Sequence, residues 1–342
     1  MFKHILVPLD GSPLAEQAIP LAARLARTTG GSVLLVRVVS PLPEFGMYVP
    51  ESFPYLQDIQ DDEAARATAY LSQMAASVPL DGINTQIAVF SGAIAAHLLD
   101  AARDEQIDLI VMSSHGYSGF KRWALGSIAQ KVIHHSPVPV LLLRQHGQKL
   151  SGLSHVVPHP LRALVALDGS PFAETALQPA AELVAAFSAP AQGELHLIQL
   201  VKQPTVEEEM TYEHLGIDVD IRQAALYKCG EYLQAVREHL IHEMVDPNIN
   251  VTWSVEECSD VAETLMKLAE RGEGVAPRAP ADLVVLATHG RGGVQRWLLG
   301  SVTERLLVHS SLPVLIVRPT EPVAKEPKAL QQEGILQGVG LD

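Results

Sequence analysis

Two sequence motifs occur twice in this chain, and the repeat constrains the fold more than any other feature. Residues 5–18 read ILVPLDGSPLAEQA, and residues 163–176 read ALVALDGSPFAETA. Residues 111–127 read VMSSHGYSGFKRWALGS, and residues 285–301 read VLATHGRGGVQRWLLGS. The period is close to half of the 342 residues, which is the size of a domain. The repeat therefore indicates an internal duplication rather than an array of short repeats.

The duplication predicts two domains with short connecting segments. We place the first domain at residues 1–145, a linker at 146–160, the second domain at 161–318 and a C-terminal tail at 319–342. The linker is polar and contains Gly and Pro, and Pro and Gly also punctuate the tail. The second domain is the longer of the two, in part because Glu270–Ala281 exceeds its counterpart Arg103–Ile107.

Within each half, short apolar segments alternate with segments of helical period. Strands are predicted at about 4–9, 32–39, 85–90, 109–113 and 138–143, and again at 163–167, 194–201, 249–255, 283–287 and 313–317. Helices are predicted from Pro13 to Gly30 with a kink at Pro20, and at about 62–76, 94–102, 127–134, 171–187, 218–243, 260–270 and 301–308. Strands separated by helices indicate β-α-β units and a parallel sheet covered on both faces. The predicted fold class is α/β, with two tandem doubly wound (Rossmann-like) domains.

Composition excludes several classes of function. Lys and Arg number 25 against 39 Asp and Glu, and the formal charge of −14 disfavours nucleic acid or a membrane surface as the main partner. Cys229 and Cys258 are too few for a disulfide framework, which is typical of a reducing cytosol. No leader segment or apolar run of membrane-spanning length is found. A soluble, cytoplasmic protein is therefore expected.

Both repeated motifs follow strands whose carboxyl ends would line a crevice. Asp10-Gly11-Ser12 follows the first strand, and the segment from Ser113 to Ser127 follows the fourth. A ligand of an open parallel sheet binds at this edge, and a glycine opening a helix leaves amide groups for a phosphate. Each motif alone is explained by an ordinary turn or helix cap. Their joint placement, twice in one chain, favours a nucleotide site in which Asp10 accepts from a ribose hydroxyl.

The combination of these motifs resembles the universal stress protein family, and two copies resemble its tandem form. The resemblance covers about residues 1–144 and 162–318. It implies five-stranded parallel sheets of strand order 3-2-1-4-5 and an intrachain pseudo-dimer that often forms through the last strands. A further homodimer and unidentified protein partners are left open.

The resemblance also implies a set of nucleotide-binding residues. Family members that bind ATP match Gly-x-x-Gly-x9-Gly-[Ser/Thr], and here Ser113 and Ala287 replace the first glycine. The implied set is Pro8, Asp10, Ser12, Val38, Met112, Ser113, His115, Gly116, Gly126, Ser127 and Ile128 in the first half, and Asp168, Ser170, Leu200, Ala287, Gly290, Gly300, Ser301 and Val302 in the second. The first half matches better, because Ala166 replaces Pro8 and Glu257-Cys258-Ser259 corresponds to Phe90-Ser91-Gly92.

The sequence-based hypothesis is a cytosolic stress-response protein that binds ATP, with or without Mg²⁺, chiefly through its first half. It would act as a nucleotide-dependent regulator, with no permanent cofactor, metal site or catalytic residue. At most a slow ATPase is expected, because no P-loop, Gly-x-Ser-x-Gly or His-Glu-x-x-His motif is found. Two alternatives stay open. One is a tandem scaffold without nucleotide, and the other is a slow small-molecule enzyme whose pocket would be lined by the Pro41–Tyr55 and Glu207–Leu215 loops.

Overall fold

A computed structural model describes residues 2–39, 56–114, 125–144, 160–203, 221–244, 248–272, 279–288 and 299–319. The predicted linker and tail lie outside the described residues apart from Pro160 and Pro319, as do the Pro41–Tyr55 and Glu207–Leu215 loops. No helix within these ranges is long and apolar enough to cross a membrane.

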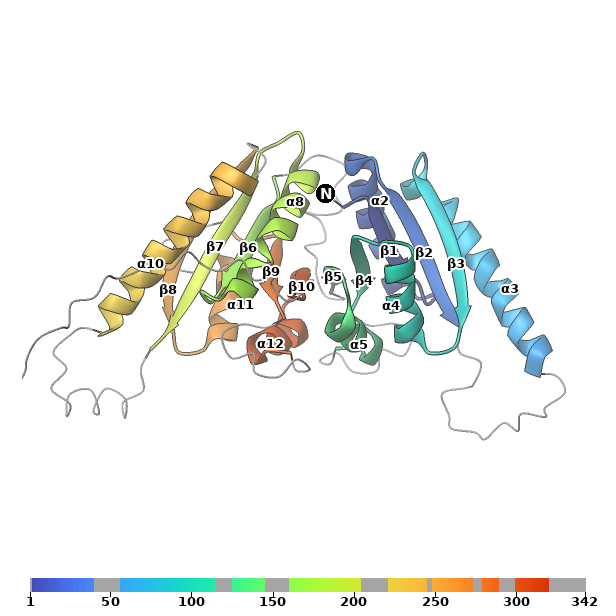
Figure 1. Ribbon diagram of the computed structural model, residues 1–342. Coiled ribbons are helices and arrows are strands. Elements are labelled where there is room, and N and C mark those ends of the chain that lie inside the picture. The colour runs from blue at the N-terminus through green and yellow to red at the C-terminus, as the bar shows by residue number, and fades with distance from the viewer. Residues whose placement is uncertain are drawn as a thin grey trace, which may run out of the picture.

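Ten strands form one continuous sheet through both halves (Figure 1). They are β1 His4–Pro8, β2 Ser32–Val39, β3 Asn84–Ser91, β4 Leu109–Ser113, β5 Val140–Leu143, β6 Arg162–Leu167, β7 Gly193–Lys202, β8 Ile249–Cys258, β9 Leu283–Ala287 and β10 Val314–Val317. Their order is β3-β2-β1-β4-β5-β10-β9-β6-β7-β8. All pairs are parallel except β5–β10. The predicted doubly wound α/β class is confirmed.

Helices cover both faces of this sheet. They are α1 Pro13–Glu16, α2 Ala18–Thr29, α3 Leu56–Ala75, α4 Ile94–Asp104, α5 Ser127–His135, α7 Pro171–Glu174, α8 Leu177–Ser188, α10 Ile221–His239, α11 Val261–Arg271 and α12 Ser301–His309. A short 3-10 helix, Val78–Leu80, and a π-helical turn, Leu240–Met244, complete the described elements. Side chains of α2, α3, α8 and α10 belong to the core on one face, and those of α4, α5, α11 and α12 to the core on the other.

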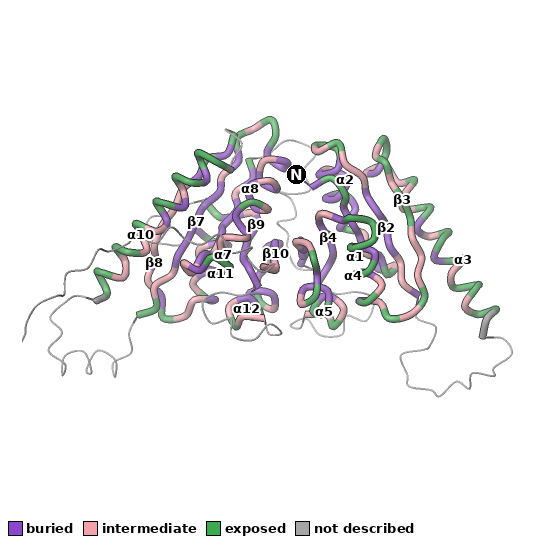
Figure 2. The backbone as a smooth tube through the Cα atoms, in the orientation of Figure 1, coloured by how far each residue is buried: buried purple, intermediate pink, exposed green. Residues whose placement is uncertain are grey.

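Each core runs without interruption from the first half into the second. Leu25 of α2 and Phe187 of α8 belong to one buried cluster, and Leu142 of β5 and Val314 of β10 belong to the other. The strands are buried along most of their length, whereas the outer surfaces of α3 and α10 are exposed (Figure 2). Because both halves share their apolar clusters, we expect them to unfold together.

Strand pairing and two arginines hold the halves together. Leu141 of β5 pairs with Leu315 of β10 in the antiparallel register. Arg144, directly after β5, reaches the C-terminal end of α12, where its Nε donates to the carbonyl of Ser310 at 3.1 Å and Nη2 to that of Val308 at 2.5 Å. Its Nη1 donates to the carbonyl of Leu307. On the opposite face, Arg24 Nη2 donates to the carbonyl of Phe187 at 2.5 Å.

The first helix of each half is broken rather than kinked. We predicted one helix with Pro20 inside it, but α1 ends at Glu16 and α2 begins at Ala18. Pro20 is then the third residue of a new helix, where the backbone N–H has no intrahelical acceptor in any case. The second half repeats this arrangement, with α7 ending at Glu174 and Pro179 third in α8.

The strand register corrects one predicted correspondence between the halves. Phe90 pairs with Val38, and Glu256 pairs with the equivalent residue Leu200. Phe90 therefore corresponds to Glu256 and not to Glu257. In this register β8 continues one residue further than β3, to Cys258, and α11 therefore begins one residue later than α4 does.

Candidate functional site

The turn after β1 is a closed hydrogen-bonded unit. Asp10 Oδ1 accepts from the Ser12 amide at 3.0 Å and from Ser12 Oγ at 2.6 Å. The same Oγ accepts from the Ala15 amide at 3.2 Å and so caps α1. Gly11 lies in the left-handed region with φ of 88°, which the turn requires and which glycine adopts without strain. Ser12 is buried, whereas Asp10 is exposed at the sheet edge.

The second half reproduces this turn. Asp168 Oδ1 accepts from the Ser170 amide at 2.9 Å and from Ser170 Oγ at 2.6 Å. Ser170 Oγ in turn accepts from the Ala173 amide at 3.2 Å, and Gly169 has φ of 79°. In both halves, therefore, the serine shapes the turn and orients the aspartate.

A tyrosine–glutamate pair supports each turn, and sequence reasoning missed it. Tyr70 Oη donates to Glu16 Oε1 at 2.9 Å, and Tyr232 Oη donates to Glu174 Oε1 at 2.9 Å. Burial, followed by the hydrogen bond to Glu16, raises the pKa of Tyr70 above its ordinary value. The guanidinium of Arg37 lies over the Tyr70 ring, 4.9 Å from its centroid. The glutamates belong to the repeated motif, so the repeat itself carried a signal for this pair.

The helices after β4 and β9 begin differently from those after β1 and β6. Gly126 and Gly300 are their N-caps, and neither offers a side-chain hydrogen bond to the first turn. By contrast, Ser12, Ser170 and Asp260 cap their helices through side-chain oxygens. The first amides of α5 and α12 thus lack the side-chain acceptor that α1, α7 and α11 carry, as do those of α2, α4 and α8. Such a helix start favours an anion.

Each glycine cap is fixed against the end of the preceding strand segment. The Gly126 amide donates to the carbonyl of Ser114 at 2.9 Å, and the Gly300 amide donates to that of Thr288 at 3.0 Å. A Cβ on Gly300 would lie 3.4 Å from the Thr288 carbonyl oxygen, which is ordinary contact. Ser127 and Ser301, the first residues of the two helices, are exposed.

The replacement of the first motif glycine does not strain the backbone. Among the described residues, the only non-glycine residue with positive φ is Gln106, at 49°. Ser113 and Ala287 are therefore regular strand residues with negative φ, a conformation that any L-residue adopts. The departure from the glycine pattern consequently adds only a small buried side chain at each position.

Strand pairing brings the two motifs of a half together. β1 pairs with β4, and β6 pairs with β9, so the aspartate turn and the glycine-capped helix follow neighbouring carboxyl ends. Val38 and Leu200 lie near the ends of the adjacent strands β2 and β7, half-buried. Four strands separate β1 from β6, so the two halves form two separate crevices rather than one.

The other predicted site residues divide into described and undescribed positions. Met112 is buried in β4, whereas Pro8, Ile128 and Val302 are half-buried around the same edges. His115, Gly116 and Gly290 lie outside the described residues. No group of three or more His, Cys, Asp or Glu side chains that could hold a metal occurs within the ranges that the structure describes.

The sequence of this chain is similar to that of a known protein family. The family model described as "Universal stress protein family" matches residues 1–144 and 161–318. The chain belongs to this family. A universal stress protein of Mycolicibacterium smegmatis is 25% identical over 328 residues, covering 92% of this chain and 97% of the relative. A single-domain universal stress protein of Thermus aquaticus is 34% identical over 145 residues, covering 42% of this chain and 100% of the relative.

Solved structures agree on the fold. A universal stress protein from Archaeoglobus fulgidus aligns with a TM-score of 0.60 and 20% sequence identity. The alignment covers 92% of this chain and 98% of that one. The tandem α/β arrangement is therefore shared by this universal stress protein and that structure.

Proposed function

We propose that this universal stress protein binds an adenine nucleotide, ATP, in the crevice between the Asp10 turn and the start of α5. The observation that supports this most is the pair of glycine-capped helix starts, each beside a hydrogen-bonded Asp-Gly-Ser turn. The turn orients the exposed Asp10 carboxylate at the sheet edge, where it would accept from a ribose hydroxyl. The first amides of α5 would donate to a phosphate.

The first half is the preferred site. Its β1 ends with Pro8 as in the family pattern, whereas Ala166 stands at that position in the second half. Negative φ at Ser113 removes the objection that the missing glycine would distort the backbone. Bound nucleotide would report on the cell's energy state to protein partners in the cytoplasm, so the proposed role is regulatory. No described residue is assigned to hydrolysis.

The test is nucleotide binding measured with matched substitutions in the two halves. Gly126→Asp places a carboxylate at the cap of α5, where Asp is a favoured N-cap, so the helix is retained while the anion position is closed. Gly300→Asp makes the same change at α12. Asp10→Ala and Asp168→Ala form the second matched pair.

We expect ATP to raise the melting temperature, by an amount that corresponds to about 2.7 kcal/mol when its concentration is 100 times Kd. Asp10→Ala and Gly126→Asp should weaken binding at least about tenfold, while the variants of the second half change it less. Native mass spectrometry of the purified protein would give the number of nucleotides per chain. Unchanged affinity in both first-half variants would disprove the site, and an empty protein that ignores ATP and Mg²⁺ would favour the scaffold alternative.

A further inference from the structure

The two crevices share one hydrogen-bonded turn but differ in the charges around it. The aspartate and glutamate of the first turn, Asp10 and Glu16, recur as Asp168 and Glu174 with matching hydrogen bonds. Both turns therefore present a carboxylate with the same local geometry. The residues that differ between the halves are those that act on a charged ligand.

Arg37 brings a positive charge to the first turn. Its guanidinium lies between the turn and the Tyr70 ring, because Cζ is 4.9 Å from the ring centroid and a Cβ on Gly11 would lie 3.3 Å from Nη1. Burial is the largest cause of the raised pKa of Tyr70, and among the nearby charges Asp10 raises this pKa while Arg37 lowers it. No hydrogen bond or ion pair engages the guanidinium in the part of the chain that the structure describes. Its charge is therefore not cancelled by a bonded carboxylate.

The second half has a neutral amide at this position. Gln199 precedes Leu200 in β7 as Arg37 precedes Val38 in β2, and it pairs with Leu167, the residue before the turn. Its side chain is 4% exposed, and its Oε1 has no hydrogen-bond partner in the described structure. An unpaired acceptor next to the turn favours a ligand group that donates a hydrogen bond and disfavours a phosphate oxygen, which accepts.

The two glycine-capped helix starts also differ in charge. Glu304 is the fourth residue of α12, whereas α5 has Gln130 at this place and no acidic residue in its first turn. Both side chains are exposed. Because helical side chains point toward the N-terminus, a carboxylate here places its charge near the amides that would hold a phosphate. It is favoured by the helix dipole itself and repels a second anion.

The next residue of each helix is a cation, but only one of the two is paired. Arg305 Nη1 donates to Asp260 Oδ2 at 2.5 Å, and Asp260 is the N-cap of α11. Lys131 of α5 has no ion pair among the described residues, and the corresponding N-cap of α4 is Ala93. The cation beside the first helix start is therefore available to a ligand, whereas that beside the second is neutralised.

These positions give the two crevices charges of opposite sign. Arg37 and Lys131 contribute +2 to the first crevice, whereas Arg305, Asp260 and Glu304 contribute −1 to the second. The overall charge of the chain is −14, so the first crevice is a local exception to an acidic surface.

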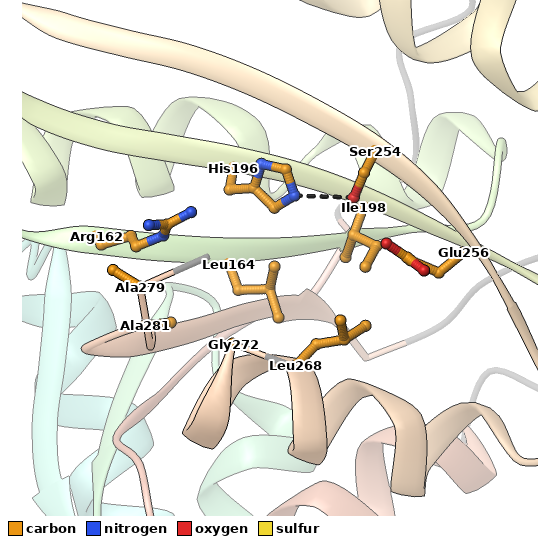
Figure 3. A pocket seen from close by; sticks show the side chains of 10 residues that line it. All are labelled: Arg162, Leu164, His196, Ile198, Ser254, Glu256, Leu268, Gly272, Ala279 and Ala281. Carbon is orange, nitrogen blue, oxygen red and sulfur yellow. Dashed lines mark hydrogen bonds between the residues drawn. The ribbon is translucent and has the colours of Figure 1, made fainter. Parts of the chain in front are cut away.

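Other charges of the second half do not reverse this difference. Arg162, which lines the pocket drawn in Figure 3, pairs with Glu194 Oε1 at 3.2 Å, and Arg222 pairs with Glu257. Glu256 of β8, also drawn in Figure 3, aligns with an aromatic residue of β3 and adds a carboxylate that the first half lacks.

The sequence of the segment after β7 points the same way. Lys202 ends β7, but residues 203–220 contain no Lys or Arg and six acidic residues, which are Glu207, Glu208, Glu209, Glu213, Asp218 and Asp220. The corresponding residues 40–55 contain two acidic residues, Glu44 and Glu51. The single lysine is therefore outnumbered by the acids that follow it.

From these differences we infer that the two crevices select ligands by charge. The first takes an adenine nucleotide with its phosphates, and the second takes the nucleoside without them, adenosine. This inference rests on the proposed function, because the shared turn is taken to recognise the nucleoside part in both halves. ATP is a polyanion and responds to the difference in charge, whereas adenosine is uncharged and does not. One chain would then hold both ligands at once.

The test compares ATP with adenosine by calorimetric titration and native mass spectrometry of the full chain. We expect one ATP per chain but two adenosines. Asp168→Ala should lower the number of adenosines to one and leave ATP binding unchanged. Asp10→Ala should leave one adenosine site, to which ATP binds at least tenfold more weakly than adenosine.

Charge substitutions test the cause of the selection. Glu304→Gln combined with Asp260→Asn, which keeps an N-cap, should strengthen ATP binding to the second crevice at least tenfold and leave adenosine binding unchanged. Arg37→Gln combined with Gln130→Glu should weaken ATP binding to the first crevice at least tenfold, again without effect on adenosine. Glu238→Gln is the charge control, because this glutamate is exposed on α10 and should affect neither ligand.

Circular dichroism and thermal melting would verify that each variant is folded. Two ATP sites of similar affinity in the wild type would overturn the inference, as would a single adenosine site or charge variants that change ATP and adenosine binding equally. Failure of the proposed function gives a different result, an Asp168→Ala chain that binds no ATP. Added salt should narrow the difference in ATP affinity between the crevices, since screening acts on charge and not on shape.

Discussion

Replacing Arg144 with Met should destabilise the whole protein, because this side chain ties the first half to the second. Its guanidinium donates to three carbonyls at the C-terminal end of α12, those of Leu307, Val308 and the C-cap residue Ser310. These carbonyls have no partner within the helix, and a positive charge at a helix C-terminus is favourable. Met retains most of the aliphatic bulk, so the substitution chiefly removes the hydrogen bonds and the charge.

The magnitude follows from the number of bonds and the burial of the arginine. A hydrogen bond from a charged donor contributes about 1.5–3 kcal/mol. Desolvation opposes this gain, as the lowered pKa of Arg144 also indicates, so we expect a net loss of about 3–4 kcal/mol in the free energy of unfolding. For a chain of 342 residues that unfolds as one unit, the loss corresponds to a fall of roughly 4–6 °C in the melting temperature.

Urea unfolding followed by circular dichroism would measure this loss. Arg103→Met is the matched control, because Arg103 pairs with Asp100 on the exposed surface of α4 and its side chain is 53% exposed. That pair should contribute no more than about 0.5 kcal/mol. If Arg144→Met shifted the urea midpoint no further than Arg103→Met, the bonds to α12 would not stabilise the junction. A single transition in the wild type with separated transitions in the variant would further show that the halves had been uncoupled.

Two further predictions concern single sites. Gly31→Ala should lower the free energy of unfolding by about 3 kcal/mol, because the added Cβ would lie 2.3 Å from the backbone oxygen of Lys3. Gly30→Ala, whose Cβ meets no atom within 4 Å, should lower it by only about 1–2 kcal/mol through the strain of a positive φ. Equal melting temperatures of the two variants would contradict this. The hydrogen bond from Arg305, together with the Glu263 amide, holds the pKa of Asp260 below its ordinary value. The ionised Asp260 carboxylate therefore stabilises the folded protein above about pH 4, and this stabilisation is lost as the pH falls through the lowered pKa. Asp260→Asn, which keeps an N-cap, should reduce the acid dependence of the urea midpoint, and an unchanged acid slope would refute the assignment.

The sequence predicted the positions of most elements because their signals are local. β2, β4 and β9 have the predicted bounds, since each is a short apolar run between polar or turn residues. The break at Gln17 was not predicted, because the sequence indicated one continuous helix with a kink at Pro20. The sequence pattern showed that Pro20 would lie inside the predicted helix. In the structure a new helix begins two residues earlier, so Pro20 lies in its first turn.

The candidate site was predictable in its placement but not in its hydrogen bonds. Asp10, Ser12 and Gly126 are marked by the repeat and by their positions after strands. The support of the Asp10 turn by Tyr70 is a contact between residues 54 apart, Glu16 and Tyr70, which no local pattern specifies. A serine can replace the first motif glycine at position 113 only if φ is negative there, and the place of Ser113 in β4 sets that φ.

The sequence alone thus determined the duplication, the α/β class and the two motifs at the strand ends, because turn chemistry and apolar periodicity act over a few residues. Tertiary structure decided how the halves join, through β5–β10 pairing and the reach of Arg144 into α12. It also decided which side chains surround His196 in the second half. His196 meets Thr252 and Ser254 only because strand register aligns β7 with β8, and register depends on the packing of the complete sheet.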